Sequence, residues 1–205
     1  MKKAFSILSL LAILLTLASC SEREEAGEFD NWKSRNQHYI DSIATLANQG
    51  RDGWTKMLAY NLIDTVEAKA PDTNHWIYLQ RLSTGTGTHR PQYCDSIRMH
   101  YIGRLIPTAE HPQGYVFGKS YVSYTLNEST DVPTLMAVRD NVVGMCTATM
   151  HMVEGDQWRI VIPHYLGYGE SQSSGSSIPG YSALIFDVKL AKVYRYGIDS
   201  GTTWH

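Results

Sequence analysis

One stretch, residues 155–169, constrains the fold of this chain more than any other. Large apolar residues alternate with other side chains in W-R-I-V-I, residues 158–162, a pattern that predicts a β-strand with at least one buried face. Pro163 ends this strand because proline cannot donate to a sheet ladder. The glycine-rich turn that follows presents Tyr168 at the start of a loop rich in serine and glycine. A rigid strand that delivers an aromatic side chain to a loop is typical of a functional site.

Composition places the chain among ordinary globular proteins. It has 205 residues, of which 43% are hydrophobic and 19% charged, and its formal net charge is -2. These values fit one globular domain with additional segments, and they exclude a disordered or fibrous chain. The near-neutral charge lacks the basic footprint of nucleic-acid binding, so we expect no nucleic-acid partner.

Residues 1–19 have the pattern of an export signal. Two lysines follow the first methionine, an apolar run covers residues 7–17, and small residues precede Cys20. The run is too short to span a bilayer as a helix. Leu-Ala-Ser-Cys resembles a bacterial lipobox, in which the cysteine is lipid-modified and becomes the mature N-terminus; the alternative is an ordinary secretory signal. We expect a lipoprotein signal peptide, lipidation of Cys20 and a tether over residues 20–28.

A lipid on Cys20 would hold the protein to a membrane outside the cytoplasm. We therefore expect a cell-envelope location, anchored to the outer membrane on its periplasmic or surface-exposed face. Two further cysteines, Cys94 and Cys146, could form a disulfide in an oxidising envelope. Cys146 lies among apolar residues of a predicted helix, where a buried free thiol is the commoner case, so we expect no bridge.

Residues 29–72 are predicted to form a helical N-terminal extension. Apolar residues recur at three- and four-residue intervals over residues 29–46, with Asp30 as the predicted N-cap and Gly50 as the predicted end. A second apolar stripe predicts another helix within residues 54–71. The helices could form a homodimerisation arm or a client-holding surface. The alternative is that they pack on the following domain, which we favour because each stripe is only as wide as one packing face requires.

Five motifs between residues 76 and 192 are similar, in the same order, to those of the FKBP family of peptidyl-prolyl isomerases. The first three are M-H-Y-I-G at 99–103, where the family has V-H-Y-T-G; Y-V-F-G-K-S at 115–120, where it has x-x-F-D-S-S; and N-V-V-G-M at 141–145, where it has V-I-x-G-W. The fourth is I-P-H-Y-L-G-Y-G at 162–169, where the family has I-P-x-x-L-A-Y-G. The fifth is I-P-G-Y-S-A-L-I-F-D-V-K-L at 178–190, where the family has I-P-P-x-A-T-L-V-F-D-V-E-L. The G-T-G of residues 85–87 also looks like the turn near the start of FKBP domains.

The resemblance implies an α+β fold. We expect a twisted antiparallel sheet of about five strands wrapped around one short helix at residues 142–152, with an apolar pocket between helix and sheet. The FKBP-type domain would cover residues 73–192, followed by a C-terminal tail at 193–205. Local patterns agree with this fold, because strands alternate and only one short helical stretch lies inside the domain.

The resemblance also implies a reaction that uses no metal, cofactor or nucleophile. Rotation about a peptide bond costs ~18–20 kcal/mol because twisting breaks amide resonance. A catalyst accelerates the rotation if it binds the twisted amide better than the planar one. A dry aromatic pocket does so by favouring the less polar, twisted carbonyl over its hydrated planar form. The substrates would be proline-containing polypeptides.

The pocket residues follow from the resemblance. The catalytic residues would be Tyr101, Phe117, Tyr168 and Phe186, and the peptide would contact Val142, Met145 and Ile178. The Val142 backbone N–H would donate to a peptide carbonyl, and the Tyr168 hydroxyl would donate to the carbonyl that precedes proline. Core packing alone could explain Tyr101 and Phe186. Tyr168 is harder to explain in that way, because a tyrosine between two glycines in a turn is poorly placed for a core.

Two positions depart from the family pattern and leave two functions open. Gly118 stands where the family has aspartate, which would remove an acidic edge, and Met145 replaces a tryptophan on the pocket floor. The family's phenylalanine near Pro133 could correspond to any residue of the segment 134–136, which reads Thr134, Leu135 and Met136. We expect an envelope isomerase that assists the folding of exported proteins, with an activity weakened by these two departures. The alternative is a catalytically silent binding or chaperone module in an envelope assembly.

Overall fold

The computed structural model describes residues 27–65, 69, 71–171 and 177–199. The chain divides into two compact units, Met1–Asp30 and Asn31–His205. The predicted signal peptide, Cys20 and most of the tether lie outside the described residues. Among the residues that are described, none of the helices has both the length and the hydropathy needed to cross a membrane.

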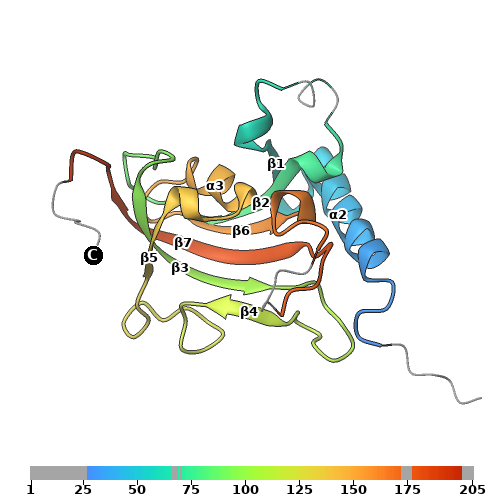
Figure 1. Ribbon diagram of the computed structural model, residues 1–205. Helices are drawn as coiled ribbons and strands as arrows, with labels where there is room; N and C mark the ends of the chain where they lie inside the picture. The colour runs from blue at the N-terminus through green and yellow to red at the C-terminus, as the bar shows by residue number, and fades with distance from the viewer. Residues whose placement is uncertain (1–26, 66–68, 70, 172–176, 200–205) are drawn as a thin grey trace, which may run out of the picture. The chain divides into compact units, whose positions relative to one another are not determined.

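The second unit contains an antiparallel sheet of seven strands in its described part, which confirms the α+β class (Figure 1). The path of the sheet is β1-β2-β6-β7-β3-β4, and β5 pairs with β3 beside it. The strands are β1 (Trp54–Leu58), β2 (Trp76–Ser83), β3 (Ser96–Arg104), β4 (Val116–Lys119), β5 (Thr134–Ala137), β6 (Gln157–Ile162) and β7 (Leu184–Tyr194). β7 extends two residues beyond the predicted domain end at residue 192.

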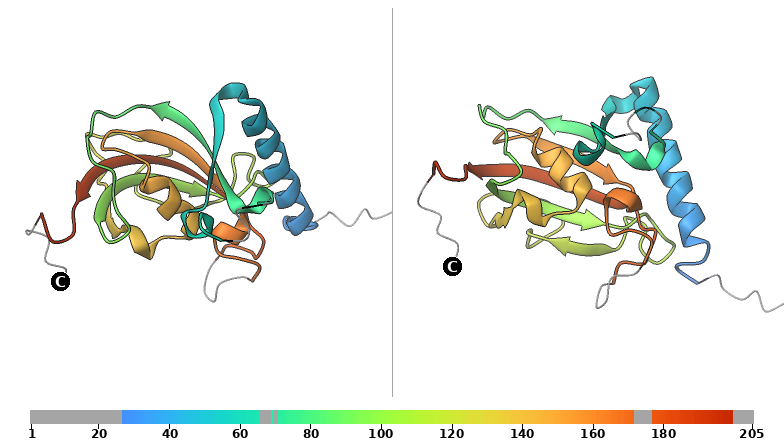
Figure 2. Two further views of the ribbon diagram at one scale, coloured as in Figure 1. Left: turned by 90° about the horizontal axis from the view of Figure 1, so that it is seen from above. Right: turned by 45° about the horizontal axis from the view of Figure 1, so that its top comes forward.

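Two α-helices cover opposite faces of this sheet (Figure 2). α3 (Val143–Thr149) packs on the face of Ile162, whose side chain lies directly against Gly144. α2 (Trp32–Gln49) packs on the other face, where Lys56 of β1 donates to the Asn48 side chain of α2 at 2.6 Å. Short 3-10 helices join the elements: η2 (Arg51–Gly53), η3 (Tyr60–Leu62), η5 (Thr73–His75), η6 (Val138–Asp140) and η7 (His164–Leu166).

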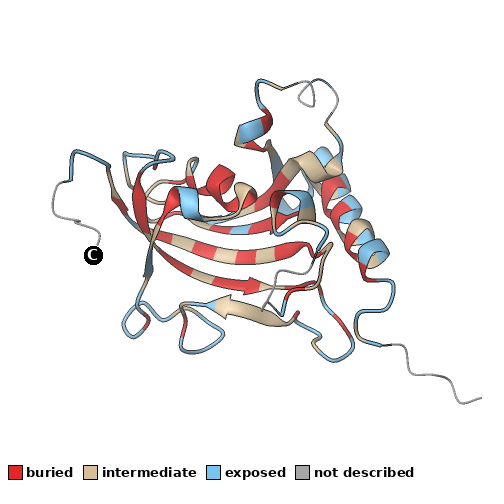
Figure 3. Cartoon of the chain, viewed as in Figure 1, coloured by how far each residue is buried: buried red, intermediate tan, exposed pale blue. Residues whose placement is uncertain are grey.

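α2 confirms the apolar stripe and the C-terminal end of the first predicted helix, but not its predicted N-cap. Its buried residues are Trp32, Asn36, Ile40, Ile43 and Ala44, which form one side of the helix (Figure 3). Gly50 ends it with a left-handed φ of 62° and donates its N–H to the carbonyls of Leu46 and Ala47. The N-cap position is held by Asn31, so the prediction of Asp30 was wrong. The Asp30 carboxylate instead accepts the Gly27 N–H at 2.9 Å.

The predicted second helix within residues 54–71 is wrong, because this region begins with strand β1. Trp54 pairs with Gln80 and Leu58 pairs with Trp76 across the β1–β2 ladder. The apolar spacing fits a helix, but pairing with the exposed edge of β2 satisfies the backbone and places Trp54 beneath α2. The apolar stripe of α2 covers its own sheet, which supports the packing alternative; homodimerisation stays a prediction.

Both described cysteines are free thiols, as expected: Cys94 is exposed and Cys146 is buried.

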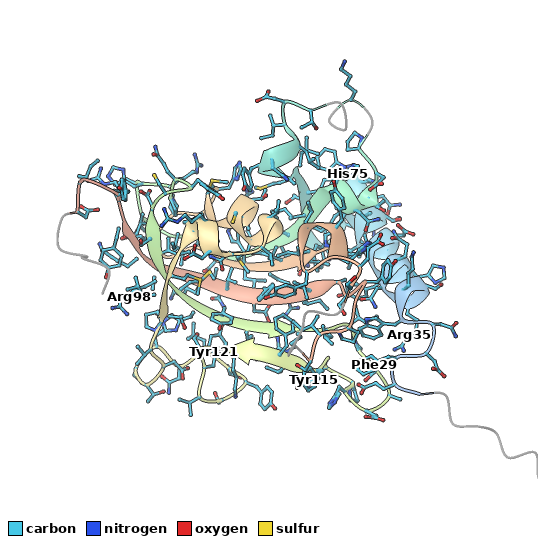
Figure 4. The ribbon with its side chains drawn as sticks, viewed as in Figure 1. Phe29, Arg35, His75, Arg98, Tyr115 and Tyr121 are labelled. Atoms are coloured by element: carbon cyan, nitrogen blue, oxygen red, sulfur yellow. The ribbon has the colours of Figure 1, made fainter. Side chains whose placement is uncertain are left out.

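His100 of β3 lies on the face opposite to the pocket residues, beneath the segment that joins β4 to β5. Its side chain is 4% exposed, and the ring of Tyr121, which follows β4, lies 6.4 Å from it (Figure 4). Burial lowers the pKa of His100; the carboxylates of Glu128 and Asp131 oppose this shift, and the Lys189 ammonium adds to it. The folded state therefore binds a proton at His100 more weakly than the unfolded chain does.

We expect His100 to make the protein less stable in mild acid. Because its folded pKa is lowered, the free energy of unfolding should fall as pH decreases below the unfolded value of about 6.5. His100→Gln should reduce this slope between pH 8 and about pH 5 in urea unfolding followed by fluorescence. His164, whose pKa is also lowered by burial, should account for the pH dependence of stability that remains in this variant. Equal slopes for the wild type and His100→Gln would contradict this assignment.

Candidate active site

A cavity of about 260 Å³ lies between α3 and the sheet. It collects side chains from β3, β4, β5, β7, the η6–α3 turn and the turn after β6. Six of the seven predicted pocket residues line it: Tyr101, Phe117, Val142, Met145, Tyr168 and Phe186. Segments separated by up to 85 positions in the chain, residues 101–186, thus meet at one place, although the catalytic and binding roles of these residues stay predictions.

Three aromatic rings form one wall of the cavity. The rings of Phe117 and Phe186 meet edge to face with centroids 5.4 Å apart, and the Tyr101 ring lies 6.5 Å from that of Phe186. Tyr101 and Gly103 share a face of β3 because side chains alternate along a strand. Gly103 has no Cβ, which leaves room for both phenylalanine rings: an added Cβ would lie 2.6 Å from the Phe117 ring and 2.7 Å from the Phe186 ring.

The floor and one edge come from α3 and the turn before it. Met145, which the resemblance matches to a tryptophan, is 3% exposed. The turn is fixed by the Asn141 side-chain amide, which donates to the carbonyls of Ala137 at 2.9 Å and Val138 at 3.2 Å. The Cys146 Sγ lies 3.1 Å from the Val138 carbonyl, and burial raises the pKa of this thiol, so it stays a protonated donor.

Val142 and Tyr168 offer polar groups at the cavity. Val142 is the N-cap residue of α3, and its N–H has no acceptor within the described part of the chain. Tyr168 is 48% exposed, and its hydroxyl likewise has no hydrogen-bond partner among the described residues. The neighbouring Gly169 N–H donates to the His164 carbonyl at 2.9 Å, which holds the turn. A bound peptide could therefore use both donors without breaking a bond inside this part of the chain.

Contrary to the prediction, Ile178 does not line the cavity. It is 7% exposed and joins the hydrophobic core, and it is not among the residues that line the cavity. The motif places it in the correct segment, but sequence pattern does not distinguish a residue that faces the pocket from one that packs behind it.

The structure adds lining residues that sequence reasoning missed, Met99, Asp140 and Asn141, and it selects Met136 from the three alternatives near Pro133. Thr134 and Leu135 are exposed. The alternation of side chains along β3 could have identified Met99 as a lining residue, because Met99 and Tyr101 share a face of the strand. Asp140 keeps an acidic side chain at the cavity, so the expectation that Gly118 removes the acidic edge is only partly right.

More than half of the chain matches a known protein family. Residues 87–191 match the family model described as FKBP-type peptidyl-prolyl cis-trans isomerase. This chain belongs to that family. The matched region contains every residue that lines the cavity.

Relatives of this FKBP-type chain come from distant organisms. The "Macrophage infectivity potentiator" of Trypanosoma cruzi is 34% identical over 117 residues, 57% of this chain and 53% of that protein. The "FKBP-type 22 kDa peptidyl-prolyl cis-trans isomerase" of Escherichia coli K12 is 34% identical over 103 residues, 50% of this chain and 43% of that protein. The chain thus spans about half the length of these relatives.

A solved structure supports the fold. A peptidyl-prolyl cis-trans isomerase from Pseudomonas syringae pv. tomato superimposes with a TM-score of 0.52 at 22% sequence identity, covering 78% of this chain and 96% of that one. At this identity the likeness shows the FKBP-type fold alone.

Proposed function

We propose that this FKBP-type chain is a peptidyl-prolyl cis-trans isomerase that acts on proline-containing polypeptides and assists the folding of exported proteins in the bacterial cell envelope. The observation that carries the proposal is the aromatic cavity that contains Tyr168 and Val142. Its apolar wall could hold a prolyl ring, and the Tyr168 hydroxyl and the Val142 N–H, which have no partner in the described chain, are hydrogen-bond donors.

The cavity would act by binding the twisted amide better than the planar one. Phe117, Phe186 and Tyr101 would exclude water from the carbonyl that precedes proline, which disfavours the planar, more polar amide. The Tyr168 hydroxyl would donate to that carbonyl, while the Val142 N–H would hold the peptide that follows. Each factor of ten in rate requires about 1.4 kcal/mol of preferential binding, so a few such contacts suffice for a useful acceleration.

A proline-limited refolding assay tests the proposal, using chain that lacks residues 1–20. The wild type should accelerate the slow phase, which lasts ~10–100 s without a catalyst. Tyr168→Phe should lower kcat/KM about three- to tenfold, because one hydrogen bond in the transition state is lost. Tyr165→Phe is the matched control, since Tyr165 is a neighbouring tyrosine, 53% exposed, outside the cavity. If equimolar wild-type protein leaves the rate of the slow phase unchanged, isomerase activity is excluded.

A catalytically silent binding module is the second candidate, and Gly118 and Met145 favour it. Position 118 has room for a Cβ, because an added Cβ would lie 3.6 Å from Tyr101 Cε2, an ordinary contact. If the chain is a weakened isomerase, Gly118→Asp combined with Met145→Trp should raise kcat/KM by about tenfold through one more polar contact and a firmer floor. Binding of a proline peptide without any gain in turnover would favour the silent module.

The location is a separate part of the proposal. The Leu-Ala-Ser-Cys sequence supports lipidation of Cys20 and anchoring to the outer membrane, on either face. Labelling cells with a tagged fatty acid should mark the wild type but not Cys20→Ala. Protease treatment of intact cells should then digest a surface-exposed form and spare a periplasmic one. A Cys20→Ala protein that still carries the label would contradict the anchor.

A further inference from the structure

The N-terminal helix α2 contacts the segment that leads from the Tyr168 turn into β7. Trp32 Nε1 donates to Ser182 Oγ at 2.9 Å, in a buried contact between residues 150 positions apart. One turn further along the helix, Asn36 Oδ1 accepts the Ala183 N–H at 2.8 Å. Asn36 is 2% exposed and Ser182 is 3% exposed, so water does not compete for these bonds.

Asn36 is held in place from within the helix. Its Nδ2 donates to the Trp32 carbonyl at 2.8 Å, so both ends of the side-chain amide are used. Ser182 Oγ in turn donates to the Pro179 carbonyl at 2.7 Å. Arg35, from the same end of α2 (Figure 4), donates to the Pro107 carbonyl at 3.4 Å. The contact between α2 and residues 179–183 is therefore a fixed polar network in a buried place.

Tyr181 connects the network between α2 and residues 179–183 to the turn that carries Tyr168. The Tyr181 N–H donates to the Gly169 carbonyl at 3.0 Å, and the Tyr181 hydroxyl donates to the Glu170 carboxylate at 2.9 Å. Tyr181 has a φ of 62°, which costs a residue with a side chain about 1–2 kcal/mol and persists only where the surroundings impose it. The Lys33 ammonium of α2 lies 4.2 Å from the centre of the Tyr181 ring.

The side chain of Tyr168 depends on this backbone. Its hydroxyl has no partner in the described chain, and the side chain is 48% exposed, so its position follows from the adjacent backbone at Gly169. Gly180 lets the two segments approach, because an added Cβ would collide with the Glu170 carbonyl. Gly169 is thus bonded on one side to His164 and on the other to Tyr181.

We propose that Trp32 and Asn36 are positioning residues for the active site: through Ser182, Ala183 and Tyr181 they fix the backbone at Gly169 and so the place where Tyr168 meets a bound peptide. The inference rests on the proposed use of Tyr168 as a donor to substrate. It gives the helix outside the matched region 87–191 a role in peptide binding as well as in packing.

Amide hydrogen exchange in the full chain, solubilised in mild detergent, tests the coupling without reference to activity. Asn36→Ala should raise the exchange rate of the Tyr181 amide about tenfold, because the bond that holds the neighbouring segment is gone. Trp32→Phe keeps the aromatic packing, removes the donor to Ser182 and should act in the same direction. Ile43→Ala is the control: it creates a cavity under the same helix, away from this network, and should leave the Tyr181 rate within about twofold.

A double-mutant cycle tests positioning against a merely structural role. Asn36→Ala should lower kcat/KM about three- to tenfold in the wild-type background and cause no further loss in the Tyr168→Phe background. Ile43→Ala should leave kcat/KM unchanged at temperatures where it is folded. Additive losses from Asn36→Ala and Tyr168→Phe would overturn the positioning role.

The two measurements separate failure of this inference from failure of the proposed function. If the wild type does not accelerate proline-limited refolding, the isomerase proposal fails, and the exchange rate of Tyr181 still decides the coupling. If the wild type is active but Tyr181 exchange is unchanged in both Asn36→Ala and Trp32→Phe, the inference fails alone.

Discussion

Gly103→Ala should remove most of the isomerase activity and leave the chain folded. The added Cβ would lie 2.6 Å from the Phe117 ring and 2.7 Å from the Phe186 ring, closer than packed carbon atoms approach. Both contacts are with the ends of side chains, so the rings should turn away and disrupt the aromatic wall. We expect kcat/KM to fall about 100-fold, as misplacement by about 1 Å can cause, and stability to fall by about 1–3 kcal/mol.

Gly118→Ala is the matched control for this change. Gly118 is the residue of β4 paired with Gly103 on β3, and it also lies at the cavity. A Cβ there would be 3.6 Å from its nearest neighbour, in the Tyr101 ring, so the added methyl group has room. Proline-limited refolding and urea unfolding of both variants make the comparison. Full activity of Gly103→Ala would show that the Phe117–Phe186 wall takes no part in catalysis.

Deleting residues 1–50 should leave the remaining chain largely unfolded. The deletion removes the buried Trp32, Ile40 and Ile43 and uncovers Tyr78 and Val161 on the sheet. Each large apolar side chain contributes about 1.5–3 kcal/mol when buried. The three side chains together contribute about 4.5–9 kcal/mol, which is comparable with the whole stability of a small domain, about 5–15 kcal/mol. Urea unfolding followed by near-ultraviolet circular dichroism should show no cooperative transition for residues 51–205.

A chain that begins at residue 21 and carries Ile43→Ala is the control for the deletion. A single cavity should cost about 2–5 kcal/mol and keep a cooperative transition at lower urea. If the chain from residue 51 unfolds at the same urea concentration as the chain from residue 21, the matched domain is stable without α2.

The sequence predicted the fold best where local pattern and tertiary packing agree. Alternation over residues 158–162 and a stop at Pro163 predict β6, and the structure has it at Gln157–Ile162. Prediction failed at β1, where Trp54, Met57 and Leu58 are spaced as in a helix. Pairing with the edge of β2 outweighs that local preference, and a partner strand cannot be read from the pattern of one segment.

The candidate site was predictable through its motifs but not in its details. The motifs identified six lining residues because spacing within the family fixes their places. Ile178 was misplaced, and Asp140 was missed because its contribution depends on how η6 enters α3. The contacts of Trp32 and Asn36 with residues 182 and 183 could not be predicted, since they join distant segments through side chains that look like ordinary helix residues.

The position of β7 bears on how the chain reaches its native state. β7 is the last strand of the described chain, yet it lies inside the sheet between β6 and β3, which have no other common neighbour. During synthesis, β3 and β6 therefore lack their common partner until residues 184–194 emerge. Pairing over such sequence distances forms slowly because loop closure precedes the contacts. The central part of the sheet is thus expected to close only after residues 184–194 have been synthesised, so the early chain cannot complete its sheet on its own.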